Sequence, residues 1–477
     1  MKQTNPVWRY GGFVFSAGGA RLTGVFITSL TFPYLVRHLG IEMYGLWSYV
    51  VAVCAFLDNV ADPGLSTYLI QQVASRRLAA FELVPDIVAI RLLSSSLAVV
   101  LVFAVSRFET HADIRRLFLF YGAGFFLTNL IGCEQLLGAM EMFHARSLLT
   151  VTQQAMYAAG IFLFVRSQRD ILWLPGSILT SVLLTNIVGW VLLRRRGVRL
   201  GRTVTFQRWK GILTPSAHYA VSSLMADGYR RTGHIVVRWF LGEHALGLYA
   251  AATRLVEILH HLLHVVLNVM MPRMAISAKS EPGFTRLAHL ATSVVALTSI
   301  PLAVGLFSTA HLLVPLVMGH TYLEDIALVR WMSAYLITAP AAMLLSGTIL
   351  YAMGRHRAYT ASMVGGALAG VGLYLTLIPA MGLTGAGLAF VLAELAVAVI
   401  AGVLLPSGLH DLWKNRLIGV AVLAALLMAA IVKAVNLRTS RPLLVVSAGI
   451  FVYVLATAWF VKKWLIAQAR VSQQAQA

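Results

Sequence analysis

The feature that most constrains this chain is a succession of long apolar segments joined by short polar links. A helix of about 20 apolar residues crosses the hydrocarbon core of a bilayer. In lipid, every backbone N–H and C=O must be satisfied within the protein, so these segments can only form membrane-spanning helices. Hydrophobic residues make up 59% of the 477 residues and charged residues 12%, which excludes a soluble domain carrying one anchor. The sequence therefore predicts an all-α polytopic membrane protein.

The apolar pattern predicts fourteen spans, and an even number places both termini on one side of the membrane. Of the 38 Lys and Arg residues, 22 fall on the side of the termini, nine on the other side and seven within spans. Since cytoplasmic loops carry the excess of positive charge, the termini are predicted to be cytoplasmic. The net charge of +20 thus indicates topology, not nucleic-acid binding. The expected spans are 10–36, 44–70, 85–106, 115–137, 148–166, 171–193, 212–241, 245–271, 285–308, 325–352, 357–379, 383–405, 416–435 and 442–463.

A basic cytoplasmic stretch, 194–211, divides the chain. It separates an N-terminal six-helix lobe, 1–193, from a C-terminal six-helix lobe, 212–406, which is followed by two accessory helices and a tail, 407–477. A repeat supports pseudo-symmetric lobes, because LGIEMYGLW at 39–47 recurs as LGEHALGLY at 241–249, with a fainter echo at 382–388. Glycine-rich turns are also common in unrelated helical hairpins. The register favours a repeat: Arg21 falls level with Asp62, and Arg231 level with Arg254.

The hairpin 212–271 carries a polar stripe on each of its two helices. The polar residues recur at steps of three and four, which puts them on one helical face. An Arg at the centre of a span costs about 2.5–3.5 kcal/mol to insert, so these faces are expected to look towards a cavity or towards each other.

Several motifs, together with the repeated turn, resemble those of one transporter family. They are ADPGLST at 61–67, LYAMGRHR at 350–357 and LIPAMGLTGAG at 377–387. The chain resembles, along nearly its whole length, the Wzx-type polysaccharide and lipid-linked oligosaccharide flippases of the multidrug/oligosaccharidyl-lipid/polysaccharide (MOP) exporter superfamily, which also contains the MATE transporters. The resemblance implies two six-helix lobes forming a V, with two accessory helices.

The resemblance also implies a function. Such proteins move undecaprenyl-pyrophosphate-linked oligosaccharides across the bacterial inner membrane by alternating access, coupled to H⁺ or Na⁺, for O-antigen, capsule or exopolysaccharide synthesis. Membrane lipid is a partner, and polysaccharide polymerase and chain-length proteins are candidate partners. Two related functions stay open: a MATE-type multidrug antiporter, for which an acidic or aromatic cavity is expected, and a peptidoglycan-precursor (lipid II) flippase. An enzyme is disfavoured, because no loop is large enough for an outer catalytic domain.

The intramembrane arginines are the predicted substrate-binding residues, because guanidinium groups bind pyrophosphate through paired, charge-assisted hydrogen bonds. The alternative is structural ion pairing, of Arg21 with Asp62 and of Arg231 with Asp227 or Glu257. The substrate-binding set is Arg21, Arg91, Arg230, Arg231 and Arg254.

Acidic and histidine side chains near these arginines are candidates for ion coupling, because they can exchange protons. The ion-coupling set is Asp62, Asp227, Glu257, His261 and His264. The Glu-x-x-His spacing also occurs in metal sites, but a matching set of ligands on another helix is missing, so neither a metal nor another cofactor is expected. Histidines that only form hydrogen bonds in a wet cavity are the third possibility.

Overall fold

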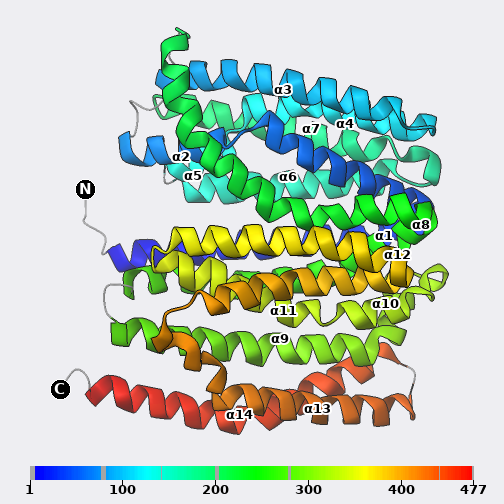
Figure 1. Ribbon diagram of the computed structural model, residues 1–477, viewed down its shortest axis with the longest axis vertical. Coiled ribbons are helices and arrows are strands. Elements are labelled where there is room, and N and C mark those ends of the chain that lie inside the picture. The colour runs from blue at the N-terminus through cyan, green and yellow to red at the C-terminus, as the bar shows by residue number, and fades with distance from the viewer. Residues whose placement is uncertain are drawn as a thin grey trace. The chain divides into compact units, whose positions relative to one another are not determined.

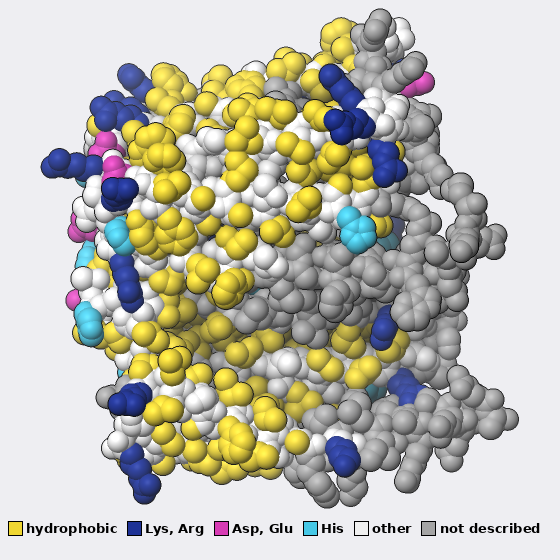
Figure 2. Space-filling model, turned by 180° about the vertical axis from the view of Figure 1, so that it is seen from behind, with side chains coloured by type: hydrophobic (Ala, Val, Ile, Leu, Met, Phe, Trp, Pro, Cys, Tyr) yellow, Lys and Arg dark blue, Asp and Glu magenta, His cyan; other side chains and the backbone are white. Residues whose placement is uncertain are grey.

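The structure, a computed structural model, describes residues 6–76, 82–140, 142–198, 203–277, 281–439 and 441–474. These residues are almost entirely helical and contain no strand (Figure 1). Eight of the described helices are long and apolar enough to cross a membrane. On the face shown in Figure 2, hydrophobic side chains cover the middle of the helices, and Lys and Arg lie towards their ends. The protein is therefore the all-α polytopic membrane protein that the sequence predicts.

The helices form two compact units, Met1–Ala250 and Ala251–Ala477, here called unit 1 and unit 2. In unit 1, α1 packs against α3, α4 and α6, and α7 packs against α4 and α6. A buried cluster that includes Leu65, Ile87 and Leu137 joins α2, α3 and α5. The elements of unit 1 are α1 (Pro6–Ala61), α2 (Leu65–Arg76), α3 (Val84–Arg107), α4 (Ala112–Ile131), α5 (Glu134–Ala139), α6 (Phe143–Phe164), η2 (Gln168–Asp170), α7 (Trp173–Arg195) and the part of α8 (Phe206–Ser277) up to Ala250.

Unit 2 begins in the second half of α8. Its last two long helices pack with α9, where Ala296 and Ile300 are buried against Ala421 and Ala425 of α13. Its other elements are α9 (Glu281–Val317), η3 (His320–Tyr322), α10 (Asp325–Met332), α11 (Tyr335–Ala342), the π-helical η4 (Met343–Leu350), α12 (His356–Val403), η5 (Ser407–Lys414), α13 (Arg416–Asn436) and α14 (Pro442–Gln474).

The repeated glycine turn has a positive φ at each of its three occurrences. Gly40 in α1 has φ 72°, Gly242 in α8 has φ 85° and Gly382 in α12 has φ 59°, and each interrupts an otherwise helical run. Residues with a Cβ rarely adopt this left-handed region, which explains the glycine. Each long helix is thus two helices joined by a tight turn, as the sequence predicts, and even the faint echo at 382 is a turn of this kind.

The second glycine of each turn motif allows a close backbone contact. Gly45 of α1 and Gly247 of α8 touch: a Cβ on Gly45 would lie 2.6 Å from the backbone N of Gly247. A Cβ on Gly247 would lie 2.1 Å from the carbonyl O of Ile41. The two halves of the repeat therefore meet at equivalent glycines within unit 1, and the sequence alone gave no reason to expect this contact.

Two expected spans are interrupted. The expected helix 44–70 breaks between Ala61 and Leu65, and the expected helix 115–137 breaks between Ile131 and Glu134. The prediction of continuous helices was wrong there, because an apolar run does not reveal where a side chain such as Asp62 or Asn186 accepts a backbone N–H. The expected helix 325–352 is one apolar span, Asp325–Leu350, made of α10, α11 and η4. Along the chain, the boundary between the two compact units falls after Ala250, whereas the predicted lobes are divided by the stretch 194–211. The lobe boundaries stay a prediction.

Candidate functional site

The break between α1 and α2 places a carboxylate, Asp62, beside α3. Pro63 lacks the N–H that a continuing helix needs, and Gly64 adopts φ 74°. Asp62 then caps α2: its Oδ1 accepts a hydrogen bond from the backbone N of Ser66 at 3.2 Å, and its Oδ2 accepts one from the Ser66 hydroxyl. The ADPGLST motif thus has a local role, which is to end one helix and start the next.

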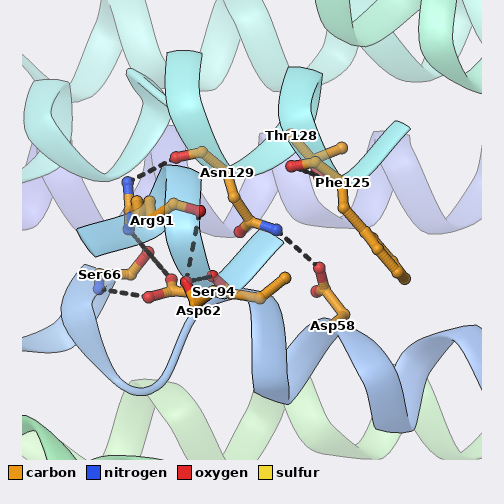
Figure 3. A network of polar contacts seen from close by, with 9 residues as sticks. Asp58, Asp62, Ser66, Arg91, Ser94, Phe125, Thr128 and Asn129 are labelled. Carbon is orange, nitrogen blue, oxygen red and sulfur yellow. Dashed lines mark hydrogen bonds and ion pairs between the residues drawn. The ribbon is translucent and has the colours of Figure 1, made fainter. Parts of the chain in front are cut away.

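Arg91 of α3 reaches this carboxylate from the neighbouring helix (Figure 3). Its Nη2 donates to Asp62 Oδ2 at 3.0 Å and to Ser66 Oγ at 2.6 Å, and its Nη1 donates to the backbone O of Asn129 at 2.8 Å. The residue is 5% exposed. A buried charge is tolerated only when it is paired and hydrogen-bonded, and Arg91 meets that condition. It ties α2, α3 and α4 together.

Asp58, one turn before Asp62 on α1, is the exposed member of the same network. Its Oδ1 accepts a hydrogen bond from Asn129 Nδ2 at 2.9 Å (Figure 3). The positive charges of Arg91 and Arg231 lie near enough to interact electrostatically with this carboxylate. We call Asp58, Asp62, Ser66, Arg91 and Asn129 the Asp58–Arg91 network. In this network the carboxylate of Asp58 is exposed, and the hydrogen bonds of the other four residues fix its surroundings.

A second charged group lies beside the Gly242 turn of α8. Arg238 forms a two-pronged ion pair with Glu109, with Nη1–Oε1 at 2.6 Å and Nη2–Oε2 at 2.7 Å. Its guanidinium lies 4.1 Å from the ring centroid of Tyr49, and Glu243 approaches it at 3.4 Å. His111 in turn lies 3.5 Å from Glu243. We call these five residues the Arg238 cluster.

Sequence reasoning missed the Arg238 cluster. Arg238 is one of the polar residues that recur along the first helix of the hairpin 212–271, but its main partner, Glu109, is 129 residues away in the link between α3 and α4. The only sequence signal was a lone Glu in that short link. The pair is well shielded, with side chains 15% and 8% exposed. Within unit 1, it attaches the first half of α8 to the α3–α4 link and to α1.

In unit 2, the predicted residues on the second half of α8 form a more open group. Arg254 and Glu257 form an ion pair at 3.8 Å, with about a third of each side chain exposed. His260 is buried and meets the ring of Tyr335 edge-on, with centroids 5.2 Å apart. His261 is exposed and His264 is half-buried.

The remaining predicted residues are placed as follows. Arg230 and Arg231 are half-buried in unit 1, whereas Arg254 belongs to unit 2. The side chains of Arg21 and Asp227 lie outside the described residues, so their expected pairings with Asp62 and Arg231 stay predictions. Asp62 has Arg91 as an ion-pair partner, a pair that the sequence analysis did not foresee. Within the described ranges, no group of three or more His, Cys, Asp or Glu side chains could hold a metal ion.

Comparison of the sequence with models of known protein families assigns the chain to one of them. The sequence model of a family described as polysaccharide biosynthesis protein matches residues 14–277, more than half of the chain. No protein of curated function matches the chain by sequence.

Solved structures of similar fold cover most of the chain. The lipid II flippase MurJ in an inward closed conformation superposes with a TM-score of 0.77 at 16% identity, covering 95% of this chain and 99% of that one. An outward-facing multidrug resistance MATE family transporter gives 0.58 at 14% identity, with 86% and 96% covered. A MOP superfamily transporter from Pyrococcus furiosus gives 0.54 at 14% identity, with 86% and 96% covered. At these identities, the structural likeness concerns the fold. The chain belongs to the polysaccharide biosynthesis protein family and has the fold of the MOP superfamily of membrane transporters.

Proposed function

We propose that this protein is a flippase that moves undecaprenyl-pyrophosphate-linked oligosaccharide units across the bacterial inner membrane for polysaccharide synthesis. The observation that carries the proposal is the family match over residues 14–277. A transporter fold with several arginines in its spans suits an anionic lipid-linked substrate, because a guanidinium keeps its charge in the membrane and binds phosphate in a two-pronged way.

The two units contribute different groups to this proposal. Arg230 and Arg231 are the substrate-binding residues of unit 1, with Asp58 as the neighbouring carboxylate on which Arg231 acts. Arg91 supports the site by fixing Asp62 and Asn129. In unit 2, Arg254 is the substrate-binding residue, and its 3.8 Å pairing with Glu257 would be exchanged for a pyrophosphate oxygen when substrate binds.

Ion coupling is proposed for Glu257, with His261 and His264 on the same helix. Protonation of Glu257 would free Arg254 to bind the substrate. Binding of a proton would thereby be coupled to binding of the anionic pyrophosphate. We expect Glu257→Gln to abolish the dependence of transport on a pH gradient while retaining substrate binding. One pH unit supplies about 1.4 kcal/mol per proton, so a single carrier can bias the direction of transport. Loss of binding together with loss of coupling would assign Glu257 a structural role.

Transport in proteoliposomes tests the function. The purified protein is reconstituted with an undecaprenyl-pyrophosphate-linked oligosaccharide, and the sugar that reaches the opposite leaflet is measured with an impermeant glycosidase. We expect translocation that Arg231→Gln removes, and Arg438→Gln, an exposed site in unit 2, serves as the control. Absence of translocation with active control flippase in parallel vesicles would refute the proposal.

A lipid II flippase is the second candidate, favoured by the TM-score of 0.77 to a lipid II flippase. The same vesicles loaded with lipid II separate the two functions. Faster translocation of lipid II than of the oligosaccharide lipid would favour this candidate. Transport of a cationic dye, inhibited by neither lipid, would instead indicate a MATE-type antiporter.

A further inference from the structure

Unit 1 carries an apolar groove that neither the Asp58–Arg91 network nor the Arg238 cluster uses. It has a volume of about 880 Å³ and is lined by residues of α4, α6, α7 and the α6–α7 link. Typical ligand pockets hold 300–1,000 Å³, so the groove can accept a lipid chain. Its walls are mainly hydrophobic, with Phe120, Leu127, Met156, Leu163 and Leu179 among them.

One end of the groove has the groups of a membrane interface. Trp173 lines it and stacks on Phe164 with ring centroids 4.7 Å apart. Tryptophan is enriched where the hydrocarbon core meets the headgroups. Arg116 lines the same groove from the first turns of α4 and is 67% exposed, with a 3.4 Å pairing to Asp113 that is itself open to solvent. Exposed pairs of this kind are weak, so Arg116 remains able to bind an anion.

Charge near this end is also positive. Arg166 and Arg169 are exposed on the α6–α7 link, next to Phe164. The carboxylate of Asp170 in that link forms hydrogen bonds within the link. It accepts them from the Ser167 hydroxyl and from the backbone N of Arg166 and Ser167. These hydrogen bonds, chiefly the one from Ser167, hold the pKa of Asp170 below its ordinary value. The carboxylate thus stabilises the link.

The groove contains one hydroxyl group that lacks a partner. Ser177 lines it, is 7% exposed, and its Oγ has no hydrogen-bond partner among the described residues. Ser177 lies one helical turn beyond Trp173 on α7, about 6 Å deeper along the axis. A buried polar group without a partner is costly, and a serine in a span usually donates to a backbone carbonyl. The Ser177 Oγ lies against Gly160 of α6, which also lines the groove, and a rotation of the side chain would turn the hydroxyl towards a ligand oxygen at this depth.

We propose that this groove binds one anionic phospholipid, with the phosphate at Arg116, an ester carbonyl accepting from the Ser177 hydroxyl, and an acyl chain along the apolar walls. The order of groups from the interface inwards is cation, aromatic ring, hydroxyl donor and hydrocarbon surface, which is the order of complementary groups in a phospholipid. A polyprenyl phosphate has no ester carbonyl for Ser177, so the hydroxyl selects the phospholipid. The site is separate from the transport residues.

Native mass spectrometry of the full-length protein, delipidated and then titrated with phosphatidylglycerol, tests the site. We expect one tightly bound lipid, and Arg116→Gln and Ser177→Ala should each lower its apparent affinity about tenfold, because each removes one hydrogen bond to the lipid. Ala159→Trp, which fills the groove without changing charge, should abolish tight binding. Arg438→Gln is the matched control. Melting curves confirm that each variant is folded.

Two further titrations identify the lipid. Phosphatidylcholine should bind more weakly than phosphatidylglycerol, and the difference should disappear in Arg116→Gln. Undecaprenyl phosphate should fail to displace phosphatidylglycerol. Displacement by undecaprenyl phosphate, or equal binding by Ser177→Ala and the parent protein, would overturn the proposal. Because binding is measured without transport, the result is independent of the proposed flippase activity.

Discussion

At the scale of single residues, arginines that look alike in the sequence have different surroundings. Arg91, Arg231 and Arg238 each lie in or near a span, and period alone places them on polar faces. Arg91 is buried with Asp62 and Ser66, whereas Arg238 is paired with Glu109. The sequence predicted that the charges need partners, but not which ones, because Asp62 lies in the α1–α2 break and Glu109 in the α3–α4 link, and only tertiary packing brings them to the arginines.

This difference predicts different phenotypes for two substitutions. Arg91→Gln leaves Asp62 without its cation in a shielded site, which costs about 3–5 kcal/mol, so the melting temperature and the yield of folded protein should fall. Arg231→Gln should leave the melting temperature within a few degrees and reduce substrate affinity about ten- to a hundredfold. Thermal unfolding and substrate binding are measured on both variants. A stable Arg91→Gln protein with lost binding would make Arg91 a substrate residue.

Charge and shape can be separated at Arg231. Arg231→Lys keeps the positive charge but loses the planar fork, so it should retain partial transport, while Arg231→Gln should lose most of it. If Arg231 only neutralises Asp227, the double change Arg231→Gln with Asp227→Asn should restore transport. We expect no rescue in cells lacking their native flippase, with the expression level of each variant checked.

At the scale of elements, the sequence revealed the turns better than the breaks. The glycine motif predicted the tight turns at Gly40 and Gly242, because only glycine suits their backbone. The break at Asp62–Gly64 was visible as a motif but was placed within a continuous span. Hydropathy cannot separate a helix from two helices joined by a capped turn when both are apolar. The interruption matters, because it provides the carboxylate that Arg91 binds.

The contact between the repeated turns predicts a strong effect of one methyl group. Gly247→Ala would place Cβ within 2.1 Å of the Ile41 carbonyl, so α1 and α8 must separate locally. Overpacking of this kind costs about 1–3 kcal/mol, and the melting temperature should fall. Gly372→Ala on α12 is the control, since no atom lies within 4 Å of the added Cβ. Equal melting temperatures for the two variants would contradict the close contact.

The Arg238 cluster predicts energetic coupling between α8 and the α3–α4 link. Glu109→Gln and Arg238→Gln should each destabilise the protein by about 3 kcal/mol, since each leaves a shielded charge unpaired. The double variant should cost less than the sum, by about 0.5–3 kcal/mol. Denaturant unfolding of the four proteins gives the coupling. Additive effects would mean that the ion pair contributes nothing beyond two separate residues.

At the scale of the whole molecule, composition was sufficient to predict a polytopic membrane protein, and the motifs were sufficient to predict the family. The substrate is less accessible to sequence reasoning, because the proposed binding residues come from segments that are far apart in the chain. Unit 1 extends to Ala250, so it includes the first half of α8, which the repeat assigns to the second lobe. The Gly45–Gly247 contact and the Arg238 cluster are what join it there.

Orientation in the membrane is the prediction that the charge count makes for the whole chain. The native cysteines, Cys54 and Cys133, are buried, so single introduced cysteines can be studied against a low background. Arg194 lies in the last turn of α7 and Thr110 in the α3–α4 link, and both are exposed. If the side with 22 Lys and Arg residues is cytoplasmic, a membrane-impermeant thiol reagent should label Thr110→Cys in intact cells and leave Arg194→Cys unlabelled until the cells are opened. Labelling of Arg194→Cys in intact cells would reverse the orientation and, with it, the direction in which the proposed substrate is moved.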